Sequence, residues 1–165
     1  MKKKQKISFK KFLTIFPEID LPITLTEADH IEYSRHNKPI PEPMIYEFLS
    51  SANDDELTEY VACFQIPQTK GFHAIVYWKA GLMEYEYQMA TYDLEGHLLD
   101  KHILAGVKSN GQTIVRSVAT IESDWLINVV EGTEAIKAKQ TVFNPQTSQV
   151  HNLELTHNGE IIIAA

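Results

Sequence analysis

The side chains best suited to acid–base chemistry lie in one stretch of the chain. Glu84 and Glu86 are two residues apart, and Asp100 and His102 have the same spacing. Residues two apart on a strand share a face and lie about 7 Å from each other. Two carboxyl groups at that separation can act as the acid and the base of a glycosidase-like hydrolase. These four residues are therefore the candidates for a carboxylate-dependent hydrolase.

Aromatic side chains in the same stretch favour binding instead. Five of them fall within sixteen positions: Tyr77, Trp78, Tyr85, Tyr87 and Tyr92. Tyrosine and tryptophan combine a large apolar area with a polar group, which suits ligand pockets and protein interfaces. Aromatic pairs across neighbouring strands also stabilise sheets without any ligand. The five residues are candidate binding residues, and packing within the sheet is the competing interpretation.

Motifs of metal, phosphate and covalent chemistry are absent from the sequence. It contains no Gly-x-Ser-x-Gly, His-Glu-x-x-His or Cys-x-x-Cys pattern. It also lacks the two glycine-rich phosphate-binding motifs, Gly-x-Gly-x-x-Gly and Gly-x-x-x-x-Gly-Lys-Ser/Thr. Asp100 and His102 can share a strand face, but a catalytic zinc site needs three protein ligands. Cys63 lies in the apolar run YVACFQI, so we expect a buried, unreactive thiol. We therefore expect no metal, no cofactor and no covalent catalysis.

Charge is distributed unevenly along the 165 residues, whose formal net charge is −7. Six lysines lie in the first eleven positions, whereas the chain from Phe12 onward carries 9 basic and 22 acidic side chains. The acidic region from Phe12 onward repels a phosphate backbone, so a basic protein is a more favourable partner than nucleic acid. No apolar run approaches the ~20 residues that cross a bilayer. A single cysteine rules out an internal disulfide, and we expect a cytoplasmic protein.

The elements that carry these residues are predicted to be strands. Beyond residue 57, nine short runs alternate with turns; they are TEYVACFQI, FHAIVYWKA, LMEYEYQMATY, HLLDKHILA, TIVRSVATI, WLINVVE, KQTVFN, VHNLELT and EIIIAA. Asp93–Gly96, Asn110-Gly111, Ser123-Asp124, Asn144-Pro145 and Asn158-Gly159 are typical turn sequences. The pattern predicts an antiparallel meander that is closed or curled into a barrel or sandwich. Runs with apolar residues on both sides, such as AIVYW and EIIIAA, are expected where both faces are covered.

The N-terminal third contains five of the seven prolines and shorter elements. ITLT and HIEYS are predicted as short strands, and PEPMIYEFLSS as a short helix with apolar residues at helical spacing. Residues 8–16 form an amphipathic lead-in whose Phe12, Leu13 and Phe16 pack onto the domain. We expect one domain over residues 1–165, with one or two short N-terminal helices in residues 1–56 and the β-meander in residues 57–165.

A family resemblance adds to the fold prediction. The segments FPEIDLP, TYDLEGHLLDKHILAG and ATIESDWLINVVEG resemble a loose group of uncharacterised bacterial all-β proteins. The resemblance implies an all-β fold and assigns no functional residues.

The function expected from the sequence is binding rather than catalysis. The partner is a protein or a small apolar ligand; in one version the chain is an acidic inhibitor or immunity-type protein that neutralises a basic partner. The alternatives are the carboxylate-dependent hydrolase and a structural oligomer.

Overall fold

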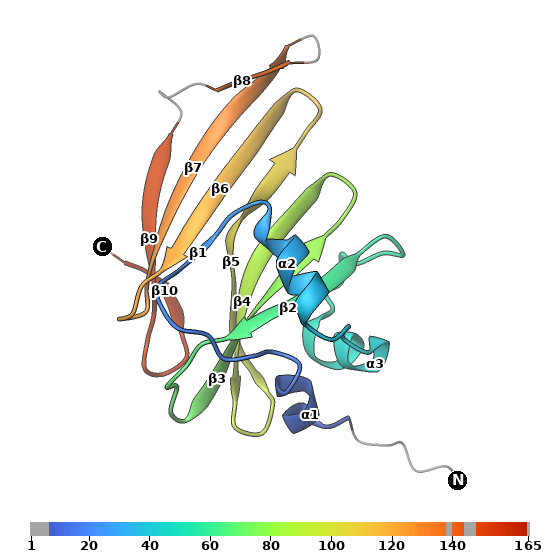
Figure 1. Cartoon of the computed structure of the whole chain (residues 1–165), viewed down its shortest axis with the longest axis vertical. Helices are drawn as coiled ribbons and strands as arrows, with labels where there is room; N and C mark the ends of the chain where they lie inside the picture. Colours follow the sequence, from blue (N-terminus) through green and yellow to red (C-terminus); the bar gives the residue numbers. More distant parts are fainter. Residues whose placement is uncertain (1–6, 138–139, 144–147, 165) are drawn as a thin grey trace.

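The computed structural model describes residues 7–137, 140–143 and 148–164, and these are mainly β (Figure 1). The helical segments are α1 (Phe9–Leu13), α2 (Asp29–His36), α3 (Glu42–Met44) and η1 (Ile45–Leu49). The strands are β1 (Ile23–Leu25), β2 (Glu59–Gln65), β3 (Phe72–Ala80), β4 (Glu84–Asp93), β5 (Leu98–Ser109), β6 (Thr113–Ile121), β7 (Leu126–Lys137), β8 (Gln140–Phe143), β9 (Gln149–Leu155) and β10 (Ile161–Ile163). No helix among the described residues is long and apolar enough to span a membrane.

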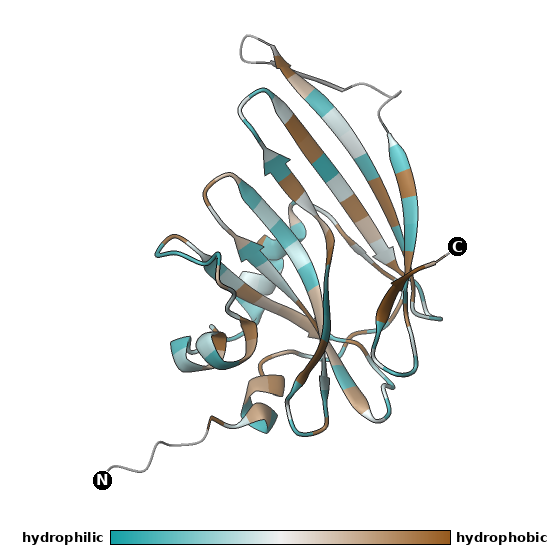
Figure 2. Cartoon of the chain, turned by 180° about the vertical axis from the view of Figure 1, so that it is seen from behind, coloured by the Kyte–Doolittle hydropathy of each residue, from teal (hydrophilic) through white to brown (hydrophobic). Residues whose placement is uncertain are grey.

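The strands form one antiparallel sheet, as predicted. Its order is β10-β9-β7-β6-β5-β4-β3-β2, with β1 added to β6 and β8 added to β7. From β2 to β7 each strand pairs with the next strand in the chain, which is the predicted meander. Figure 2 shows bands of hydrophilic and of hydrophobic residues along the strands of the sheet.

The sheet folds into two layers at the junction between β5 and β6. Strand β5 pairs with β4 over most of its length but with β6 only from Gly106 to Ser109. Beyond that point β6 takes β1 as its neighbour, with Ile23 opposite Ile121. One layer therefore contains β2, β3, β4 and the first half of β5, and the other contains β1, β6, β7, β9 and β10. Apolar residues from both layers belong to one buried core.

The two layers do not close into a barrel. Strands β2 and β10 remain the two ends of the pairing order. The chain before β1 follows the edge of β2, where the Gln65 N–H donates to the Pro17 carbonyl (2.8 Å) and Glu18 forms a single bridge to Gln65. The prediction of a curled antiparallel sheet is confirmed, and its closed-barrel form is wrong, because strand pairing stops at these two edges.

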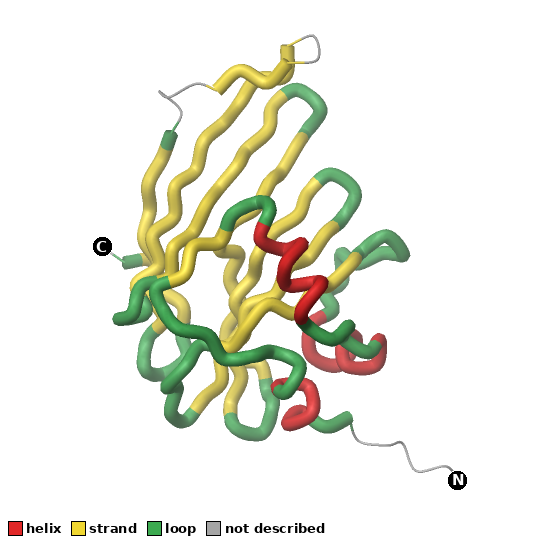
Figure 3. The backbone as a smooth tube through the Cα atoms, viewed as in Figure 1, coloured by secondary structure: helices red, strands yellow, loops and turns green. Residues whose placement is uncertain are grey.

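A second core covers the other face of β2, β3 and β4. Phe12 and Phe16 are buried there with Leu49, against Ile75 and Tyr92. The predicted packing of the N-terminal lead-in is therefore confirmed, as is the expectation that AIVYW has both faces covered. The helical segments gather beside β2 to β4 rather than beside β6 to β9 (Figure 3).

Three predictions about local structure are wrong. HIEYS belongs to helix α2, because its residues three apart meet the sheet: His30 stacks on Trp78 (4.3 Å) and Tyr33 contacts Phe64 (5.8 Å between ring centroids). Strand β10, in EIIIAA, is an edge strand whose Ile163 is 78% exposed. The described residues also contain four short helical segments, not one or two.

Candidate functional site

The aromatic residues singled out in the sequence lie mostly inside the protein. Tyr77, Tyr87 and Tyr92 are buried, and each hydroxyl donates to an internal acceptor. The acceptors are Gln88 Oε1 (2.7 Å), the Thr26 carbonyl (2.8 Å) and the Phe48 carbonyl (2.7 Å), respectively. Burial raises the pKa of all three phenols. The Tyr87 and Tyr92 hydroxyls therefore join the sheet to the N-terminal segments, whereas the Tyr77 hydroxyl bonds to the neighbouring strand β4.

Trp78 and Tyr85 also make intramolecular contacts. Trp78 is 8% exposed and lies under the His30 ring. Tyr85 is partly exposed and donates to Glu27 Oε1 (2.5 Å). Burial, together with that hydrogen bond, raises the pKa of Tyr85 to about 12. Arg116 pairs with the other oxygen of Glu27, so these contacts fix the segment between β1 and α2 on the sheet.

The four acid–base candidates are divided between two places. Glu84, Glu86 and His102 line one cleft of about 520 Å³ beside Lys79. Asp100 instead accepts the Ile161 N–H (2.7 Å) and attaches β10 to β5. Among the described residues no hydrogen bond joins His102 to either glutamate, and His102 Nδ1 lies 2.8 Å from the Ile103 carbonyl.

Glu86 is the half-buried carboxyl group of this cleft. Burial raises its pKa, the neighbouring Glu84 adds to the rise, and the Gln88 amide that donates to Glu86 Oε1 (2.5 Å) opposes it. The Lys79 ammonium, opposite on β3, is held instead by Asp54 (2.6 Å) and Ser51 (3.0 Å). Burial works to raise the pKa of Asp54, but the hydrogen bonds from Lys79, Tyr60 and Ser51 outweigh it and bring that pKa to about 2.

Replacing Glu86 with glutamine is expected to increase the free energy of unfolding at pH 7 and to leave it unchanged near pH 3. The folded protein raises the Glu86 pKa, so folding disfavours the ionised carboxyl. That penalty is absent below about pH 4, where the group is protonated in both states, and complete once the pH exceeds the folded pKa. Urea unfolding at both pH values measures the difference. The exposed Glu84, paired with Lys108 at 3.5 Å, supplies the control variant Glu84→Gln, which should change little. A loss of stability in Glu86→Gln at pH 7 would contradict the expectation.

Asp93, Glu95 and His97 form a small cluster on the exposed turn after β4. One ligand atom of each lies within 4.8 Å of the others. The turn itself explains this proximity, because Asp93 accepts the backbone N–H groups of Glu95 and His97 (both 2.9 Å). The cluster therefore carries no metal assignment.

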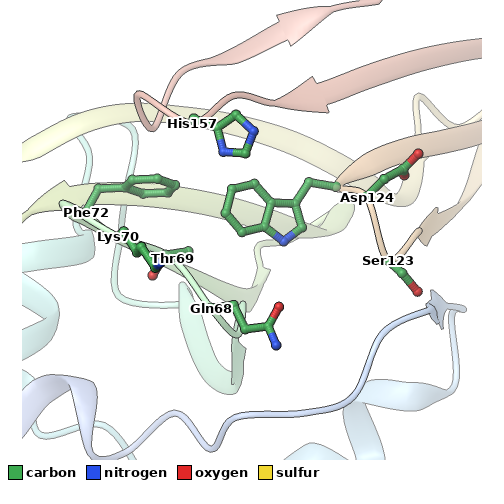
Figure 4. Close-up of a pocket in the computed structure, with 8 residues that line it drawn as sticks. Gln68, Thr69, Lys70, Phe72, Ser123, Asp124 and His157 are labelled. Carbon is green, nitrogen blue, oxygen red and sulfur yellow. The ribbon is translucent and has the colours of Figure 1, made fainter.

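A larger cavity, of about 760 Å³, lies at the opposite end of β4 from Glu84 and Glu86, since its lining residue Phe72 pairs with Asp93. It is an open cleft between the loops that join β2 to β3, β6 to β7 and β9 to β10 (Figure 4). Its lining residues are Gln68, Thr69, Lys70, Phe72, Ser123, Asp124, Trp125 and His157. We refer to it as the loop cleft.

The β6–β7 turn in the loop cleft has tryptophan where related turns have glycine. Turns 93–97, 122–126 and 156–160 share one hydrogen-bond pattern, in which the first residue donates to the fifth and the fourth donates to the first. In two of them the fourth residue is Gly96 (φ +95°) or Gly159 (φ +84°). In the β6–β7 turn it is Trp125, with φ +69°.

This backbone conformation is strained for any residue with a side chain. The left-handed region costs an L-residue about 1–2 kcal/mol, and bulky residues are rare there. Gln68 also has a positive φ of +65°, directly after Pro67, where a type II turn favours glycine or asparagine. Gln68 and Trp125 are the two such non-glycine residues within the described ranges, and both line the loop cleft. Strained residues of this kind concentrate at functional sites.

Neighbouring side chains hold the Trp125 ring at the wall of the cleft. The ring lies edge-on to Phe72 (6.0 Å, 81°) and tilted against His157 (5.4 Å, 50°). Its backbone carbonyl accepts the Leu155 N–H (3.1 Å), which ties the turn to β9. The indole is partly buried, so one portion is fixed by packing and another remains accessible from the cleft.

Several polar groups around this ring have no protein partner, whereas the Ser123 hydroxyl donates to the Leu21 carbonyl (3.3 Å). Within the described part of the chain, the side chains of Gln68, Thr69 and Lys70 make no hydrogen bond or ion pair, and neither does the Trp125 indole N–H. On the other wall, Asp124 uses one oxygen to accept the Leu126 N–H (3.2 Å). Lys70 and Asp124 lie on opposite sides of the cleft (Figure 4). The cleft thus offers an aromatic surface, several free donors and acceptors, and one charge of each sign.

The sequence predicts the turn at Ser123-Asp124, but Trp125 and the rest of the loop cleft are not among the predicted site residues. A usable signal was present, since Trp125 follows two turn residues at the position that glycine fills in the sequences DLEG and THNG. The cleft itself could not be predicted from local sequence patterns, because its residues come from three loops, and more than thirty residues separate each loop from the next.

Comparison of the chain with family models, with curated proteins and with solved structures found no match. The resemblance to bacterial all-β proteins therefore stays a prediction.

Proposed function

We propose that this chain is a non-catalytic binding protein that holds a small ring-bearing ligand in the loop cleft. The observation that carries the proposal is Trp125 in the left-handed position of the β6–β7 turn. Glycine would form the same turn without strain, so the backbone of the turn has no need of an indole there. The ring instead forms one wall of the cleft, beside the side chains of Gln68, Thr69 and Lys70, which have no protein partner among the described residues.

The chemistry of the lining supports binding more than catalysis. A nucleophile needs a general base within hydrogen-bond reach, and no described lining residue makes such a contact with another. The predicted carboxylates Glu84 and Glu86 lie at the other end of the strands, and Asp100 is separated from them. Asp124 is the one carboxylate among the lining residues, and one of its oxygens accepts the Leu126 N–H within the turn.

Fluorescence of Trp125 provides a direct test. The chain contains two tryptophans, so Trp78→Phe leaves Trp125 as the sole emitter. We expect a saturable change in its emission with at least one member of a panel of neutral disaccharides, nucleosides and aromatic carboxylic acids. Amide chemical shifts in NMR should move in residues 68–72, 122–125 and 157.

The matched control is Trp125→Phe, in which Trp78 is the sole emitter and should not respond. If no probe at millimolar concentration changes the emission or the amide shifts, the proposal is wrong. Shifts confined to the cleft of Glu84 and Glu86 would move the binding site to that cleft and would also contradict it.

A further inference from the structure

We propose that the ligand of the loop cleft is a neutral carbohydrate, an inference that rests on the proposed binding function. A carbohydrate ring has an apolar face of C–H groups and an edge of hydroxyl groups. The loop cleft presents one partner for each: the Trp125 indole for the face and a ring of polar side chains for the edge. Three properties of the lining lead to this class of ligand.

The first property is polarity. Six of the eight lining residues have polar side chains, and only Phe72 and Trp125 are apolar. Sites for apolar ligands are lined mainly by hydrophobic side chains with few polar groups. An apolar ligand here would take water from Gln68, Thr69 and Lys70 without replacing its hydrogen bonds, which costs affinity. A ligand rich in hydroxyl groups replaces them.

The second property is charge. Lys70 and Asp124 stand on opposite walls, so the lining carries one positive and one negative group. An anion drawn to Lys70 meets Asp124 and a body of strong net negative charge, whereas a cation drawn to Asp124 meets Lys70. A hydroxyl group is neutral and both donates and accepts, so it can bond to either wall. The presence of one positive and one negative group on opposite walls therefore favours an uncharged ligand.

The third property is the shape of the aromatic wall. Phe72 meets the Trp125 ring at 81°, so the two rings form a corner instead of a parallel slot. A flat aromatic ligand binds best between parallel faces, whereas a puckered ring can lie on a single indole face through C–H contacts. The indole N–H at the edge of that face adds a donor for a ring hydroxyl.

Isothermal titration of the full chain with defined sugars tests the class of ligand. The probes are maltose, cellobiose, lactose and N,N′-diacetylchitobiose, with adenosine and indole-3-acetate as ring ligands of other chemistry. We expect at least one disaccharide to bind more tightly than both of the latter. Because the ligand is neutral, its Kd should change less than about twofold between 50 and 500 mM salt.

Two lysine variants give the matched comparison. Lys70→Ala should weaken the binding of that disaccharide by about tenfold, the size of one lost hydrogen bond from a charged donor. Lys101→Ala removes a lysine from the cleft of Glu84 and Glu86 and should leave the Kd unchanged.

The outcomes separate this inference from the function on which it rests. Binding of adenosine or indole-3-acetate without any sugar would overturn the carbohydrate inference and leave the loop cleft as a ligand site. Strong salt dependence, or equal effects of Lys70→Ala and Lys101→Ala, would also overturn it. Binding of no probe at all would contradict both.

Discussion

Replacing Trp125 with glycine is expected to abolish ligand binding while changing the free energy of unfolding by less than about 2 kcal/mol. The change removes the aromatic wall of the loop cleft and the contacts of the ring with Phe72 and His157. It also relieves the strained left-handed conformation, which is worth about 1–2 kcal/mol. The two effects on stability oppose each other, whereas the effect on binding is not compensated. Urea unfolding and ligand titration of the same variant measure both.

Two further substitutions provide comparisons for this prediction. Trp125→Ala removes the ring but keeps the backbone strain, so it should be less stable than Trp125→Gly by about 1 kcal/mol. Trp78→Ala leaves a cavity in the core between the two layers and should lower the free energy of unfolding by about 3–5 kcal/mol. If Trp125→Gly loses as much as Trp78→Ala, the indole is an anchor of the fold and its position needs no ligand to explain it. Unaltered ligand affinity in Trp125→Gly would place the binding site elsewhere.

Replacing Gly106 with alanine is expected to destabilise the protein by more than about 3 kcal/mol, at the upper end for an overpacked position. A Cβ atom there would lie 2.3 Å from the Tyr85 carbonyl oxygen and 2.7 Å from the Glu86 Cα. Both are backbone atoms of the paired strand β4, so no side-chain rotation relieves the overlap. Gly106 is also the first β5 residue that pairs with β6, so the clash falls where the two layers begin to separate.

Gly81→Ala is the control for this prediction. A Cβ atom at Gly81 would meet only the Glu84 carbonyl oxygen, at 3.8 Å, which is an ordinary contact. Thermal unfolding should therefore show a large drop in Tm for Gly106→Ala and little change for Gly81→Ala. Equal Tm values for the two variants would mean that β4 and β5 tolerate a wider separation than the structure shows.

The strands and turns were predictable because their signals are local. Strands β3 and β6 coincide with the runs FHAIVYWKA and TIVRSVATI, since a short apolar run and the turn residues at its ends are properties of neighbouring residues. The segment HIEYS failed because five residues cannot distinguish a strand from one and a half turns of helix. Its helix is stabilised by contacts of His30 and Tyr33 with strands more than thirty residues away.

The sequence by itself determined an antiparallel β protein with an acidic body and aromatic, carboxylate-bearing strands. Only the tertiary structure decided which of those residues meet. Tyr77, Tyr87 and Tyr92 lie inside because helical segments and the second layer cover both faces of their strands. Asp100 is separated from Glu86 because the register places Asp100 opposite Thr91, whereas Glu86 lies opposite Gly106. The loop cleft exists because the fold between β5 and β6 brings three distant loops to one end of the molecule, and no periodicity within a single segment encodes that meeting.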